Sequence, residues 1–139
     1  MRLDTARYQL AADTLAFGLR LQRRNGSGPN PFSEEQLRLL AMQGTGLREL
    51  NLPLVTRRYQ AEWDTRCAGE STDVTRTLSV GRQPQHGLAE LIVNERRVTS
   101  RSWMDGETCR DQDTPVDSER HVLRHDGRHY AVPEALRPL

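Results

Sequence analysis

Beyond Pro53 the hydrophobic residues of the chain recur with a period of two, and no other feature constrains the fold as strongly. Val55 and Trp63 lie on one side of an alternating segment, and Val74 to Val80 repeat the alternation. Successive side chains of a β-strand point to opposite faces of a sheet, so a period of two predicts strands with one face buried. We therefore expect residues 53–139 to be rich in strands.

The stretch Val80–Met104 holds the densest apolar run in the second half of the chain. We expect it to form two paired strands, 88–94 and 97–104, joined by a turn at Asn94 to Arg96. A short helix over Leu88 to Arg97 is the alternative, because the run is too brief for periodicity to distinguish the two. This pair is the predicted centre of the sheet. Residues 105–106 and 111–119 have the composition of a turn and a polar loop.

The Asp126-Gly127 dipeptide lies between two short alternating segments and is a strong hairpin signal, because both residue types tolerate positive φ. A two-residue turn at this point would pair His125 with Arg128. The three histidines His121, His125 and His129 recur at four-residue spacing. The turn argues against a helix there, so we expect no metal site and no cofactor.

Residues 3–24 show polar residues at helical spacing, including Gln9, Asp13 and Arg20, and predict a first helix. A second helix is predicted from Ser33, because Ser33 and Gln36 have the form of a capping box. Gly44 is its expected end. The loop between the two helices is the Gly- and Pro-containing segment 25–31.

These elements predict a single α+β domain over residues 1–139, with a helical part at 1–52 and a strand-rich part at 53–139. Two N-terminal helices are expected to pack on one face of a mainly antiparallel sheet of five to six strands.

All 20 basic residues are arginine, and the chain contains no lysine. Codon bias in a GC-rich bacterium or phage explains this composition more simply than selection for guanidinium chemistry. With 19 acidic residues interspersed, the net charge is only +1. That balance argues against a dedicated nucleic-acid-binding protein, which normally carries a basic excess.

No apolar stretch is long enough to span a membrane. Charged residues interrupt residues 1–24, whereas a signal peptide would have a continuous apolar segment there. The expected location is therefore cytoplasmic, where Cys67 and Cys109 would be free thiols. If a signal segment has been removed, the protein would be periplasmic or exported and a disulfide becomes the better interpretation.

Part of the stretch Val80–Met104 resembles the first half of the forkhead-associated pattern. The matching residues are Gly81-Arg82, the apolar run ending at Val93, and Val98 to Arg101. Members of that family bind phosphothreonine. The resemblance implies phosphate contacts by Arg82 and Ser100, with Arg101 in support. The histidine that usually follows the Ser-Arg pair and the later Asn-Gly signature of the family are both missing.

No nucleophile elbow and no glycine-rich phosphate loop occurs in the chain, which favours a non-enzymatic protein. We expect a protein-interaction module, such as an adaptor, an inhibitor or immunity-type protein, or a subunit of a bacterial or phage assembly. Its partner would be another protein, a second copy, or a larger assembly. Arginine and aromatic residues recur at interface hot spots and predict the contact residues Arg58, Tyr59, Arg96, Arg97, Arg101 and Trp103.

Two alternatives remain open. One is a small enzyme or ligand-binding protein with a pocket between helices and sheet. The other is a phosphopeptide-binding module that uses Arg82 and Ser100.

Overall fold

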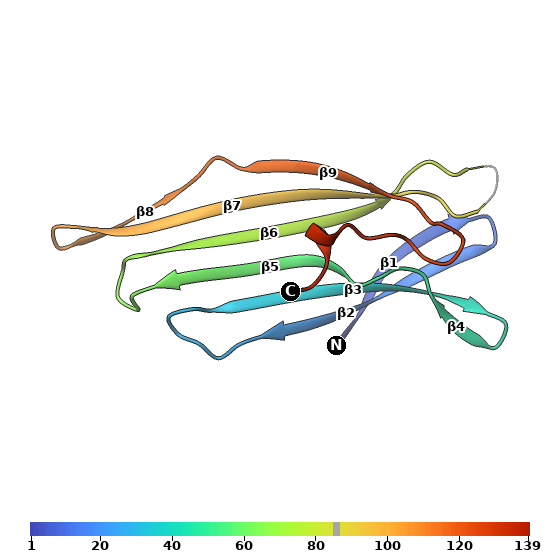
Figure 1. Cartoon of the computed structure of the whole chain (residues 1–139), viewed down its shortest axis with the longest axis horizontal. Helices are drawn as coiled ribbons and strands as arrows, with labels where there is room; N and C mark the ends of the chain where they lie inside the picture. The colour runs from blue at the N-terminus through green and yellow to red at the C-terminus, as the bar shows by residue number, and fades with distance from the viewer. Residues whose placement is uncertain (85–86) are drawn as a thin grey trace.

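The computed structural model describes residues 1–84 and 87–139, which form a single domain built on one nine-stranded antiparallel sheet (Figure 1). The strands are β1 (Arg2–Ala11), β2 (Thr14–Arg24), β3 (Phe32–Gln43), β4 (Gly46–Glu49), β5 (Leu54–Trp63), β6 (Gly69–Val80), β7 (Leu91–Asp105), β8 (Thr108–Asp113) and β9 (Asp117–Leu123). One 3-10 turn, Glu134–Leu136, follows them. None of the described residues forms a helix long and apolar enough to cross a membrane.

The strands follow one another as a meander, in the order β1-β2-β3-β5-β6-β7-β8. Each of two long strands pairs with two shorter strands along one of its edges. β3 pairs with both β4 and β5, and β7 pairs with both β8 and β9. The predicted antiparallel sheet and single domain are confirmed, and the sheet is larger than expected.

The predicted first helix is wrong, because residues 3–24 form the β1–β2 hairpin. Leu15, Phe17 and Leu19 alternate with Ala16 and smaller or polar residues, which is a period of two. Ala16 and Gly18 then face the same side as their partners in β3. The apolar residues of this segment belong to strands that carry apolar residues on both faces.

The predicted second helix is also wrong, because residues from Ser33 onward lie in β3. Glu34, in the first turn of that expected helix, is instead a buried strand residue that accepts hydrogen bonds from Arg58 and Arg23. Gly44 ends the element as predicted but does so in a two-residue hairpin turn, where its φ is 61°. Ser33 lies in the β-ladder opposite Tyr59.

The expected turn at Asn94 to Arg96 is replaced by unbroken strand, since β7 pairs continuously with β6 from Leu91 to Ser102. The polar and charged residues 94–96 have the composition of a turn. Glu95 is nevertheless buried against Arg76 of β6, whose Nε lies 2.7 Å from the Glu95 Oε1. The loop expected over 111–119 contributes most of its residues to β8 and β9. The turn at 126–127 is present, but His125 pairs with Tyr130 instead of Arg128.

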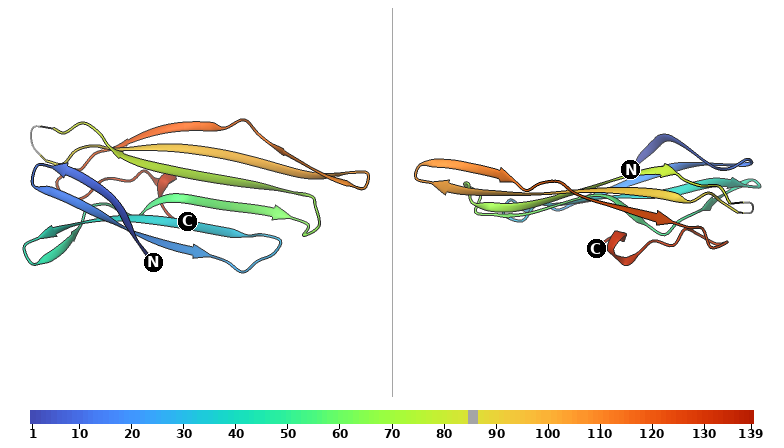
Figure 2. Two further views of the ribbon diagram at one scale, coloured as in Figure 1. Left: turned by 180° about the vertical axis from the view of Figure 1, so that it is seen from behind. Right: turned by 90° about the horizontal axis from the view of Figure 1, so that it is seen from above.

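The hydrophobic core occupies one half of the sheet, which we call the body (the described residues outside 25–32, 60–73 and 98–117). There the C-terminal segment, residues 130–139, crosses one face, and β1 lies over the other (Figure 2). Tyr130 is fully buried and its hydroxyl donates to the Ala89 carbonyl at 2.6 Å, while the Ala89 amide donates to Leu10 at 2.7 Å. The buried cluster comprises Tyr8, Leu10, Ala16, Leu37, Leu39, Ala41, Leu50, Leu54, Leu91, Val93, Leu123, Tyr130, Val132 and Leu136.

The other half of the sheet projects beyond this core as a single layer, which we call the wing (residues 25–32, 60–73 and 98–117) (Figures 1 and 2). None of the residues in the buried cluster belongs to it. Among the described residues, Cys67 is the one buried hydrophobic residue of the wing. The wing therefore lacks the apolar burial that normally stabilises a sheet.

A disulfide joins the two hairpins of the wing and replaces the free thiols expected for a cytoplasmic protein. Cys67, in the β5–β6 connection, is bonded to Cys109 of β8, with their Cα atoms 5.8 Å apart. The Asp64 carboxylate accepts hydrogen bonds from the Cys67 and Arg66 amides and holds the turn that carries Cys67. These hydrogen bonds lower the pKa of Asp64.

Beneath β1, Arg20 lies between two carboxylates. Its Nη2 is 2.9 Å from Asp4 Oδ2 and its Nη1 is 2.7 Å from Glu35 Oε1. Burial raises the pKa of both carboxyl groups. Hydrogen bonds lower the pKa by more than burial raises it. Asp4 accepts hydrogen bonds from the Ala6 amide, Tyr8 and Arg20, and Glu35 accepts them from Arg20 and Thr56. The pKa of each group is therefore below its usual value.

Because these pKa values are lowered by folding, their stabilising effect is fully present above the ordinary carboxyl pKa of about 4 and is lost as the pH falls through the folded-state values. We expect the free energy of unfolding to fall as the pH is lowered below about 4.5, as measured by urea titration. The double variant Asp4→Asn/Glu35→Gln should show a shallower fall. Asp13→Asn, at an exposed position, should keep the wild-type pH dependence; equal slopes in all three proteins would contradict this account.

A candidate binding trough on the wing

Two hollows of about 370 Å³ each lie side by side on one face of the wing and together form a feature that we call the trough. They share Tyr59, Ser71 and Ser100. The first is lined by Gly28, Pro31, Tyr59, Ala61, Trp63, Cys67, Gly69, Glu70, Ser71, Ser100 and Ser102. The second is lined by Tyr59, Ser71, Asp73, Thr75, Arg96, Val98, Ser100, Asp113, Thr114 and Val116.

The trough lies on the face that carries Tyr59, Ala61 and Trp63, which we call the aromatic face. Alternation along β5 places Arg58 and Gln60 on the opposite face, which the C-terminal segment crosses in the body and which we call the tail face. Arg58 donates to the carbonyl of Arg137 in that segment at 3.0 Å.

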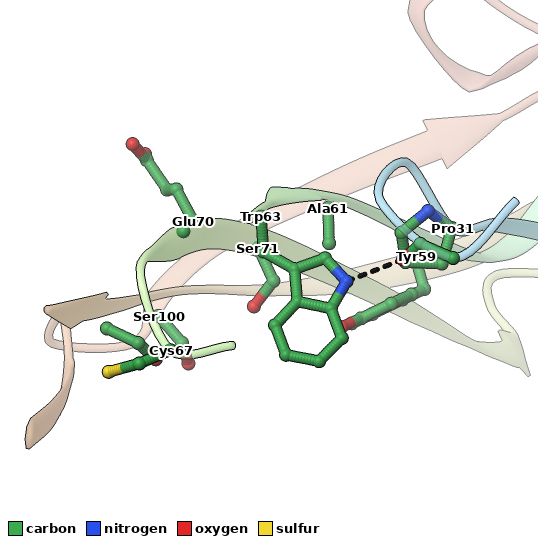
Figure 3. A pocket seen from close by; sticks show the side chains of 11 residues that line it. Pro31, Tyr59, Ala61, Trp63, Cys67, Glu70, Ser71 and Ser100 are labelled. Carbon is green, nitrogen blue, oxygen red and sulfur yellow. Dashed lines mark hydrogen bonds between the residues drawn. The ribbon is translucent and has the colours of Figure 1, made fainter. Parts of the chain in front are cut away.

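Trp63 is the most prominent side chain of the trough (Figure 3). The 25–31 connection lies along the free edge of β5, where the amides of Ala61 and Trp63 donate to Pro31 and Pro29. The indole Nε1 donates to the Gly28 carbonyl. These contacts hold the ring in place, yet the residue remains 43% exposed. Gly69 pairs with Trp63 in the ladder, and a Cβ on Gly69 would lie 2.2 Å from the Trp63 Cβ.

Carboxylates line the second hollow and the adjoining edge. Ser100 and Ser102 of β7 donate to Asp113 and Asp111 of β8 across the ladder. Asp73 of β6 holds Arg57 through Oδ2 at 3.2 Å. Its Oδ1 is buried and has no hydrogen-bond partner in the described part of the chain. The trough thus combines exposed aromatic surface with carboxylate oxygens that still have capacity to accept hydrogen bonds.

The structure divides the six predicted contact residues between the two faces. Tyr59 and Arg96 lie on the aromatic face and line the second hollow. Arg58, Arg97, Arg101 and Trp103 are on the tail face, by their register with β5 and β6. Arg101 lies over the Trp103 ring at 5.9 Å, whereas Arg58 is committed to the buried carboxylate of Glu34. They do not form one surface.

Arg82 and Ser100, the phosphate contacts implied by the resemblance, are not brought together. Arg82 follows the end of β6 in the body, and Ser100 lies in the wing opposite Ser71. Ser71 and Val80 are nine positions apart along β6, a span of about 30 Å at the usual rise per residue. Arg101 points to the face opposite Ser100. A pocket between helices and sheet likewise has no place in this all-β arrangement, because the hollows lie on the sheet itself.

The three histidines do not converge on one point: His121 is in β9, while His125 packs edge-on against Tyr130 with ring centroids 5.0 Å apart. His121 instead lies near Glu95 and Glu119, with ligand atoms of all three within 4.8 Å of one another. These residues could hold a cation, but Arg76, 2.7 Å from Glu95, already supplies positive charge there.

Trp63 is a candidate site residue that sequence reasoning missed, because it lies on the same side of the alternating segment as Val55, which favoured a place in the core. Its position at the very end of the alternating segment, next to the polar residues 64–66, was the available signal.

Comparison with known proteins identifies no relative: no protein-family model, no curated protein and no solved structure matches the chain.

Proposed function

We propose that the protein is a non-enzymatic interaction module that binds another protein through the trough on the aromatic face of the wing. The observation that carries this proposal is Trp63. Its indole is held by a loop hydrogen bond and remains 43% exposed, in a part of the sheet that has no core. Tryptophan and tyrosine held at fixed positions are the residue types most often found at interface hot spots.

The disulfide in the wing supports the same proposal. A disulfide holds the two hairpins in register without a hydrophobic interior, so the surface is ordered before any partner arrives. Preorganisation reduces the entropy lost on binding. A binding partner would also cover one face of a single-layer sheet that no described residue covers.

We further propose that the protein works outside the reducing cytosol, in the periplasm or beyond it. The Cys67–Cys109 disulfide supports this location, because such bonds persist in oxidising compartments.

Site-specific photo-crosslinking tests the proposed surface. A photoreactive amino acid at Ala61 is directed into the trough, and the same group at the neighbouring Gln60 is directed to the tail face. In extracts of the cells that make the protein, we expect a discrete adduct with another protein from position 61 and little from position 60. Trp63→Ala should weaken the interaction that yields this adduct by about 30-fold, the effect of losing a hot-spot residue.

Equal adducts from both positions, or adducts from Gln60 alone, would contradict the proposal. Trp103→Ala, which removes the half-buried ring system on the tail face, is the matched control and should leave the adduct at position 61 unchanged.

A further inference from the structure

The two halves of the molecule carry opposite charge. The wing holds nine carboxylates and three arginines, a net charge of −6, whereas the rest of the chain holds ten carboxylates and seventeen arginines, a net charge of +7. The near-neutral total therefore conceals a strong separation of charge along the long axis. The charged residues of the wing are Glu62, Asp64, Arg66, Glu70, Asp73, Arg101, Asp105, Glu107, Arg110, Asp111, Asp113 and Asp117.

Within the trough the negative charge is concentrated at one end. Asp73 and Asp113 line the second hollow, and Asp111 continues their line toward the first. Arg96 is the one arginine in the lining of either hollow, and it lies at the far end, toward the body. Glu70 belongs to the lining, but its side chain turns away from the trough (Figure 3).

The aromatic rings are arranged to receive a cation. On other aromatic side chains of this chain an arginine is already stacked: Arg23 lies over Phe32 at 5.5 Å, and Arg101 lies over Trp103 at 5.9 Å. No such partner lies over Trp63 or Tyr59 among the described residues. A guanidinium group stacks on an indole face and also pairs with carboxylates in a planar geometry.

We propose that the trough binds an extended, arginine-bearing segment of its protein partner, with guanidinium groups stacked on Trp63 in the first hollow and paired with the carboxylates of Asp73 and Asp113 in the second. This proposal rests on the function proposed above and names the chemistry of the partner. Asp73, whose side chain is 37% exposed, offers its carboxylate to the incoming guanidinium beside Arg57, which it already holds at 3.2 Å. The trough crosses β5 to β8, about 14 Å at the usual strand spacing, and accommodates about four extended residues.

Peptides of defined charge test the inference on the intact protein. Trp63 and Trp103 are the two tryptophans of the chain, so in a Trp103→Phe background the intrinsic fluorescence reports on Trp63. We expect the peptide acetyl-GRGRG-amide to change this fluorescence in a saturable manner, and acetyl-GQGQG-amide to have no effect. Raising the salt concentration from about 0.05 M to about 0.5 M should weaken the binding, because exposed charges are screened.

Two pairs of isosteric substitutions separate the trough from the general charge of the wing. Asp73→Asn/Asp113→Asn removes two charges inside the trough. Glu62→Gln/Glu107→Gln removes two charges from the tail face and the hairpin tip. We expect the first pair to weaken arginine-peptide binding by about tenfold or more and the second by less than about twofold.

Equal weakening by both pairs, or equal binding of the glutamine peptide, overturns the inference. If the peptide does not bind but the adduct at position 61 forms, the arginine-segment inference is wrong and the proposed function is still supported. If neither is observed, both the inference and the proposed function are wrong. Analytical sedimentation of the protein alone, which measures self-association, is the last experiment. If it self-associates at low salt and the Asp73→Asn/Asp113→Asn pair abolishes this, the occupant is a second copy, and the separate partner proposed here is wrong.

Discussion

Removal of the Cys67–Cys109 disulfide is expected to lower the free energy of unfolding by about 3–4 kcal/mol. The bond closes a loop with a sequence separation of 42, so its loss returns considerable conformational freedom to the unfolded chain. Without the disulfide, the β6–β7 ladder alone would hold the two hairpins of the wing together, because none of the wing residues joins the core cluster.

The double variant Cys67→Ala/Cys109→Ala should therefore unfold at a lower urea concentration than the wild type. Hydrogen exchange locates the effect: the amides of 98–105 in β7 should exchange faster in the variant, while those of 91–97 in the same strand should change little. Since both segments belong to one strand, the comparison is internally controlled. A uniform acceleration along β7 would show that the wing and the body unfold as one unit.

Arg76→Leu is expected to cost about 3–5 kcal/mol of stability, because it leaves a buried carboxylate without its main partner. The side chains of Arg76 and Glu95 are only 3% and 7% exposed, and Arg76 also donates to the Val55 carbonyl at 2.8 Å. Thermal or urea unfolding measures the loss.

The double variant Arg76→Leu/Glu95→Leu removes both charges and should recover part of that stability, since the unpaired charge is then absent. Arg38→Leu is the control for a solvent-exposed pair. It breaks the contact with Glu49, whose side chain is 45% exposed, and should cost less than about 1 kcal/mol. A loss in the Arg76→Leu/Glu95→Leu protein as large as that in Arg76→Leu would mean that the pair does not act through charge burial.

Sequence reasoning succeeded where residue type and period agreed. In β5 and β6, Val55, Val74 and their neighbours combine β-branched residues with strict alternation, and both strands form as predicted. It failed in β2 and β3, where leucine, arginine, glutamine and glutamate have high helix propensity. There the period-two pattern of Leu37, Leu39 and Ala41, all buried in β3, was the better guide, because burial in a sheet outweighs intrinsic propensity.

The site was harder to predict than the strands, because alternation tells which residues share a face but not which face is covered. Trp63 and Trp103 are both strand residues near the wing tip, and they lie on opposite faces. The C-terminal segment covers the tail face only in the body, where Tyr130 and Leu136 are fully buried. That contact joins residues far apart in sequence, and no local pattern encodes it.

Long strands that run from a packed body into an uncovered wing would place folding and the proposed recognition in separate parts of one sheet. Substitutions at exposed wing positions leave the buried cluster intact, so their effect on overall stability should be small. During evolution such a surface can change its contacts with little penalty to the fold. Related chains would then share the alternating core residues of the body and diverge in the wing, each lineage matching a different partner.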